Sequence, residues 1–185
     1  MITTTHEAPE LSIATWLNTE QPITLAGLRG RPVLMHAFQM LCPGCVAHAI
    51  PQTEKAFRLF RDTDLAVIGL HTVFEHHDAM TPGALKAFVH EYRLSFPIGI
   101  DTPSEDGPIP QTMQRYHMRG TPTTILIGRD GRVIAHQFGQ LDDMAVGAMV
   151  ASALEPGSPV AGSHGKPASH ADAGSACDDG SCVAT

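Results

Sequence analysis

One stretch of the sequence decides the fold: VLMHAFQMLCPGC, residues 33–45. The run 33–38 is apolar apart from His36, which is typical of a strand buried inside a sheet. Cys42 and Cys45 follow after a short turn, with only Pro-Gly between them. Two cysteines at this spacing indicate either redox chemistry or metal binding, so their structural context has to decide between the two.

The residues after the cysteines have helical periodicity. Between 43 and about 61, apolar side chains recur on one face of the expected helix, namely Val46, Ile50, Phe57 and Phe60. Pro51 lies inside this segment and predicts a kink, because proline lacks an N–H and clashes with the preceding turn. The cysteine pair is therefore expected at a junction between a buried strand and the N-terminus of a helix.

This junction favours thiol chemistry. Free N–H groups and the helix dipole stabilise an anion at a helix N-terminus, and such placement can lower a thiol pKa from ~8.5 to roughly 3.5–7.5. We expect Cys42 to be the nucleophile that attacks a substrate disulfide. Cys45, one turn further and more buried, would then attack the mixed disulfide and release the reduced product. The alternative is a pair of inert core cysteines.

The rest of the chain alternates strands and helices. Strands are expected within 11–24 and at 65–70, 96–100, 123–127 and 133–138, the last two joined by a hairpin turn at 128–131. Helices are expected after the Thr81-Pro82 cap, at 111–117 and at 141–154. This order predicts an α/β fold with a central mixed sheet, whose core is parallel and whose edge is antiparallel, flanked by helices.

Composition and charge exclude several classes of protein. The 185 residues carry a net charge of −7 and only 12 scattered Lys and Arg side chains, which argues against a nucleic-acid partner. Residues 1–7 lack the basic start and apolar run of a secretion signal, and no apolar run approaches the ~20 residues of a membrane span. We therefore expect a cytoplasmic protein without membrane contact, where a persistent cysteine pair is usually catalytic or metal-binding.

The composition changes after residue 155. Residues 1–155 are predicted to form one domain, and residues 156–185 a flexible tail, since that segment is rich in Gly, Ser, Ala and Pro and has no aromatic residue. Cys177 and Cys182 in the tail would form an auxiliary dithiol that passes electrons to the Cys42–Cys45 disulfide. They could instead bind a soft metal together with His164 and His170, or have no function.

Two motifs together resemble the thioredoxin superfamily: the Cys-Pro-Gly-Cys run after a strand, and Arg-Gly-Thr-Pro-Thr at 119–123. The segments 8–11, 25–33 and 128–131 resemble its TlpA-like and redoxin (AhpC/TSA-like) branch. The resemblance implies a thioredoxin-like fold, a cis peptide bond before Pro122, and substrate binding through the backbone of Thr121. It further implies a redox-active disulfide with no other cofactor, protein or small-molecule disulfides as substrates, and thioredoxin or a low-molecular-weight thiol as electron donor.

The sequence departs from the thioredoxin pattern at two positions. Leu41 precedes the first cysteine, where relatives generally have tryptophan. His36 lies six residues before the first cysteine, where thioredoxin has a buried carboxylate. Histidine titrates near neutrality, so one hypothesis is that His36 accepts a proton from Cys45. The other is a core histidine hydrogen-bonded to the backbone.

Three further functions compete with the redox enzyme. The loop after residue 70 contains His71, Glu75, His76, His77 and Asp78, which suit zinc or nickel but more simply form a polar loop beside the substrate groove. Copper(I) binding would use Cys42 and Cys45 with Met40 or the tail cysteines, although the resemblance to thioredoxins implies that Pro122 keeps metal away from the dithiol. A thiol peroxidase would be weak, because Gln39 and Met35 replace the threonine and proline of peroxiredoxins.

Overall fold

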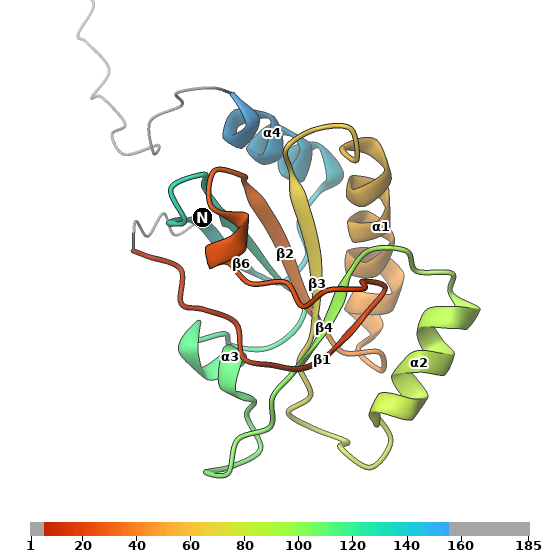
Figure 1. Ribbon diagram of the computed structural model, residues 1–185. Helices are drawn as coiled ribbons and strands as arrows, with labels where there is room; N and C mark the ends of the chain where they lie inside the picture. Colours follow the sequence, from red (N-terminus) through yellow and green to blue (C-terminus); the bar gives the residue numbers. More distant parts are fainter. Residues whose placement is uncertain (1–5, 156–185) are drawn as a thin grey trace, which may run out of the picture.

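A six-stranded sheet forms the centre of the protein (Figure 1). The computed structural model describes residues 6–155. In the order β1-β4-β3-β2-β5-β6, the sheet contains β1 (Ile13–Leu17), β2 (Val33–Phe38), β3 (Ala66–His71), β4 (Ile98–Asp101), β5 (Thr123–Ile127) and β6 (Val133–Phe138). The predicted α/β fold with a mixed central sheet is confirmed.

The sheet is parallel in the middle and antiparallel at both edges. Strands β2, β3 and β4 are parallel, whereas β1 pairs antiparallel with β4, and β5 and β6 continue antiparallel from β2. The sequence predicted one antiparallel edge only. The second is formed by β1, which runs against β4 at the opposite edge from the terminal hairpin. On the hairpin side, β5 enters the sheet at the end where β4 leaves it and therefore runs antiparallel to β2.

Helices cover both faces of this sheet (Figure 1). The helices are α1 (Ile50–Leu59), α2 (Pro82–Glu91), α3 (Gln111–Arg115) and α4 (Asp143–Leu154), with a 3-10 turn at Ala26–Leu28. On one face, side chains of α1, α2 and α4 pack on Leu34 and Phe38 of β2. On the other, α3 and the N-terminal segment pack on Met35 and Ala37. None of the helices within residues 6–155 has the length and apolarity that a membrane crossing needs.

The helix after the cysteines differs from its prediction. The sequence predicts a single helix kinked at Pro51, but the structure has a π-helical segment, Cys45–Ala49, followed by α1. Pro51 then lies in the first turn of α1, directly after the π-helical segment, whose last hydrogen bond runs from Ile50 N to Cys45 O. The Thr81 cap was predicted correctly: its side chain accepts a hydrogen bond from Ala84 N at 3.2 Å.

Candidate active site

The two cysteines lie where β2 gives way to a helix. After the strand, Cys42 N donates a hydrogen bond to Gln39 O (3.2 Å), which closes a tight turn. Val46 N then donates to Cys42 O (3.0 Å), so the first helical hydrogen bond starts from the first cysteine. Both cysteines are free thiols. The sequence thus located this strand–helix junction correctly.

The two sulfurs have different surroundings. Cys42 is partly exposed, and its Sγ accepts a hydrogen bond from Cys45 N at 3.3 Å. Cys45 has no exposed surface. Burial raises the pKa of Cys45 to about 12, and the neighbouring Cys42 raises it further. The Gln39 backbone and Thr121 lower this pKa, but by less. This asymmetry suits one accessible sulfur that attacks and a second that stays protonated until the first has reacted.

The loop before β5 faces the cysteines. The Thr121–Pro122 peptide bond is cis. Cys42 Sγ lies 3.5 Å from the Thr121 carbonyl oxygen, to which it donates, and the Pro122 ring packs against Gly44, where a Cβ would come within 3.5 Å of the ring. Thr121 and Pro122 are therefore brought together with the dithiol, although they follow it by about 80 residues.

Two exposed apolar side chains lie near the dithiol, one directly before the first cysteine and one beside the Thr121–Pro122 loop. Leu41 is 54% exposed and Phe138 is 43% exposed. The Phe138 ring lies over Gly120, and the Arg119 guanidinium stands 5.5 Å from the ring centre. Exposed apolar surface next to a reactive group is a feature of sites that contact other proteins.

His36 is buried on the face of the sheet that α1 covers. It is 1% exposed, and within residues 6–155 neither ring nitrogen has a hydrogen-bond partner. The backbone-bonded alternative is therefore wrong. Burial lowers the pKa of His36 to about 4, while the nearby Gln52 side chain opposes the shift. His36 is not among the groups that act on the Cys45 thiol, so proton transfer between them stays a hypothesis.

Gln39 is a site residue whose role the sequence analysis missed. Its side chain is 1% exposed; its Oε1 accepts from Phe74 N (3.2 Å) and its Nε2 donates to Glu75 Oε1 (3.2 Å). It thereby joins the cysteine turn to the loop after β3. The signal in the sequence was a lone polar residue between a buried strand and the cysteines, because such a residue needs hydrogen-bond partners.

The histidine-rich loop does not form a metal site. His71 is 1% exposed, whereas Glu75, His76, His77 and Asp78 are exposed. Across the described part of the chain, no three His, Cys, Asp or Glu side chains are placed to hold a metal ion. The structure therefore supports neither zinc nor nickel at this loop. At the dithiol, Met40 packs in the same apolar cluster as Cys45 and Cys42. The tail residues Cys177, Cys182, His164 and His170 lie outside the described residues.

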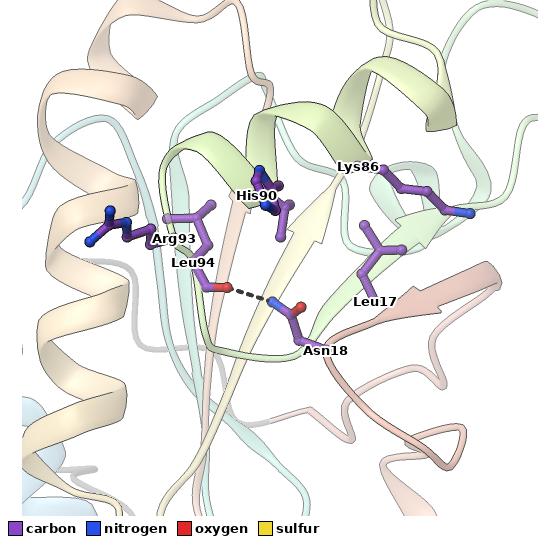
Figure 2. Close-up of a pocket in the computed structure, with 7 residues that line it drawn as sticks. Leu17, Asn18, Lys86, His90, Arg93 and Leu94 are labelled. Carbon is purple, nitrogen blue, oxygen red and sulfur yellow. Dashed lines mark hydrogen bonds between the residues drawn. The ribbon is translucent and has the colours of Figure 1, made fainter.

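A cleft lies between α2 and the end of β1 (Figure 2). Its volume is about 470 Å³, and Asn18 Nδ2, which lines it, donates to Leu94 O (2.9 Å). The cleft is lined by Leu17, Asn18, Lys86, Val89, His90, Arg93 and Leu94. None of the site residues predicted from the sequence is among them.

Comparisons with known proteins agree with this geometry. The Redoxin family model matches residues 3–151. A crystal structure of a thioredoxin-like superfamily protein is 51% identical, with a TM-score of 0.79, and covers 83% of this chain and 99% of its own. A thiol-disulfide isomerase from Corynebacterium glutamicum is 46% identical, with a TM-score of 0.76, covering 80% and 97%.

Among curated proteins, DipZ from Mycobacterium tuberculosis is 32% identical over 155 residues. The match covers 82% of this chain but only 21% of DipZ. The chain thus spans about a fifth of the length of the DipZ proteins that it matches.

Proposed function

Because this chain belongs to the redoxin family, with a thioredoxin-like fold, we propose that it exchanges its Cys42–Cys45 dithiol with disulfides of other molecules. The observation that carries the proposal is the asymmetry of the pair. Cys42 is accessible and held at the start of a helix by the Cys45 N–H at 3.3 Å, while Cys45 is buried directly behind it.

The reaction follows in two displacements. The Cys42 thiolate attacks one sulfur of the substrate disulfide, so that a mixed disulfide forms and the other substrate sulfur leaves as a thiolate that takes up a proton. Cys45 then loses its proton and attacks Cys42 Sγ, which releases the second substrate thiol. The substrate gains two electrons, and the protein is left with a Cys42–Cys45 disulfide.

The substrates we propose are disulfide-containing proteins, with small disulfides as a second class. The exposed Leu41 and Phe138 support this choice, because an extended polypeptide can cover apolar side chains that a small disulfide cannot. We assign Thr121 and Pro122 to binding the substrate backbone, since the Thr121 carbonyl lies 3.5 Å from the attacking sulfur. Thioredoxin or a low-molecular-weight thiol would reduce the disulfide again, in the cytoplasm.

Proton transfer at the second step is assigned to His36. The step needs a base because the pKa of Cys45 is about 12. Neutral His36 is a weak acceptor, since its pKa is about 4, so its effect should be modest. If His36→Leu reduces substrates at the wild-type rate from pH 6 to 9, His36 has no part in the reaction.

The test of the function is equilibration in glutathione redox buffers, followed by alkylation and mass spectrometry. We expect the wild type to interconvert between a dithiol and a Cys42–Cys45 disulfide and to reduce a disulfide-bonded polypeptide. Cys42→Ser should be inactive, and Cys45→Ser should trap the mixed disulfide. A wild type that forms no such disulfide, or a fully active Cys42→Ser, would contradict the proposal.

The auxiliary role of Cys177 and Cys182 is tested separately. If the tail dithiol passes electrons to the active site, truncation after residue 155 should slow re-reduction while leaving the first displacement unchanged. Equal turnover of the full chain and the truncated chain would show that these cysteines take no part.

A further inference from the structure

Gln39 contacts both cysteines through its main chain. Its carbonyl oxygen accepts the Cys42 N–H at 3.2 Å, which fixes the turn that presents the attacking sulfur. A backbone hydrogen bond from Gln39 also acts on the Cys45 sulfur and lowers its pKa, against the larger effect of burial. Any shift of this one residue therefore changes the surroundings of both sulfurs.

The side chain of Gln39 holds a separate part of the chain. It binds Phe74 N and Glu75 Oε1 in the β3–α2 loop, residues 72–81, with both distances at 3.2 Å. The loop is fixed at its start, where Thr72 Oγ1 donates to the buried carboxylate of Asp101 at 2.9 Å. Between its ends, Gln39 ties the loop to the cysteine turn.

We propose that Gln39 is a positioning residue through which Glu75 and the β3–α2 loop set the redox equilibrium of the Cys42–Cys45 pair. The inference rests on the proposed function, since it concerns regulation of the same dithiol. A partner or substrate that moves the loop would thereby change the reactivity of the cysteines without touching them.

The chemistry of the network requires an amide at position 39. One end of the side chain accepts the Phe74 N–H while the other donates to the Glu75 carboxylate, and an amide does both without a change of charge. Leucine is similar in size and makes neither contact. Glutamate keeps the contact with Phe74 but places two carboxylates against each other, which destabilises the pair.

Variants at positions 39 and 75 should therefore differ in their redox potential. The contacts exist in the structure with both thiols free. On this proposal they weaken when the disulfide forms, so their loss should destabilise the dithiol relative to the disulfide. We expect Gln39→Leu and Gln39→Glu to shift the glutathione equilibrium toward the disulfide by about tenfold, or about 30 mV more negative for this two-electron couple. Glu75→Gln should shift it less, because one neutral hydrogen bond can replace the charged one.

Combining Gln39→Glu with Glu75→Gln restores complementarity, because the carboxylate introduced at position 39 would accept from both the Phe74 N–H and the amide introduced at position 75. The double variant should therefore recover most of the wild-type potential, a rescue that general damage to the fold would not give. Asp78→Asn is the matched control, since it removes the same charge from the same loop outside this network. It should leave the potential unchanged.

Hydrogen exchange at the Phe74 amide supplies a second measurement on the same variants. Exchange there should be slower in the wild type and the double variant than in Gln39→Leu, which offers the Phe74 N–H no acceptor. Wild-type potentials in both single Gln39 variants, or a failed rescue, would overturn the proposal. A wild type without a reversible dithiol would instead overturn the proposed function. If Gln39→Leu does not fold, Gln39→Glu, Glu75→Gln and their combination still decide the question.

Discussion

Two buried histidines should make the stability of this protein fall between pH 6.5 and 4. His36 and His71 are each 1% exposed, and burial lowers the pKa of each from 6.5 to about 4. In this range the unfolded chain binds a proton at each imidazole that the folded chain does not. Their stabilising effect is therefore complete above pH 6.5 and is lost as the pH falls toward 4.

The expected size of this loss follows from the pKa difference. At about 1.4 kcal/mol per pH unit, each histidine removes about 3 kcal/mol from the free energy of unfolding by pH 4. Both together remove about 6 kcal/mol, which is comparable with the whole stability of many domains, about 5–15 kcal/mol. His36→Leu should also stabilise the protein at pH 7.5 by about 1–3 kcal/mol, because it removes ring nitrogens that have no partner in the described structure.

The assay is urea unfolding from pH 7.5 to 4.5, which keeps most carboxylates ionised. We expect His36→Leu and His71→Leu each to remove a contribution of about 3 kcal/mol from the pH dependence. A smaller contribution from His136, whose pKa burial also lowers, should remain in both variants. The exposed His90→Gln should leave the pH dependence unchanged. Comparing each variant with the wild type cancels the opposite contribution of Asp101, whose pKa burial raises. If His36→Leu has the same pH dependence as the wild type, the buried neutral state inferred for this residue is wrong.

Three further results are expected. At pH 8, iodoacetamide should label Cys42 at least about ten times faster than Cys45, as mass spectrometry would show, because Cys45 is fully buried and its pKa is about 12. Burial opposes ionisation of Glu54, but hydrogen bonds from Ser95 and Arg58 outweigh it and lower its pKa. Glu54→Gln should therefore cost about 1–2 kcal/mol at pH 7 and progressively less below pH 4.5, measured by chemical unfolding. Thr81→Ala should lower stability by about 1 kcal/mol in thermal unfolding, and Thr81→Ser should retain it.

The parts of the site that depend on local sequence could be predicted. The run 33–38 formed the expected buried strand, and Cys42 lies at the start of the following helix. This junction could be predicted because three sequence signals agree on it: the apolar run of the strand, the helical periodicity after the cysteines, and the Pro-Gly turn between them. The resemblance to a known family placed Thr121 and Pro122 opposite the cysteines. Spacing alone could not do so, since the chain between them passes through two strands and three α-helices.

The parts that depend on tertiary contacts could not be predicted. Nothing near Gln39 in the sequence identifies Phe74 and Glu75 as its partners, because they are 35 and 36 residues away. The antiparallel direction of β5 likewise depends on where the preceding loop returns to the sheet. The crowded histidines suggested a metal through composition, whereas the structure buries His71 and leaves the others on the surface.

The π-helical segment Cys45–Ala49 sets the rotation between the cysteine turn and α1. A turn closed by i→i+5 hydrogen bonds holds one residue more than an α-helical turn, and one residue turns a helix by about 100°. With this extra residue, Cys45 packs in the same apolar cluster as Ile50 while Cys42 stays partly exposed. Transplanting the cysteine turn into a relative with an uninterrupted α-helix would require inserting a residue at the same place, or the graft would aim its sulfurs in a different direction.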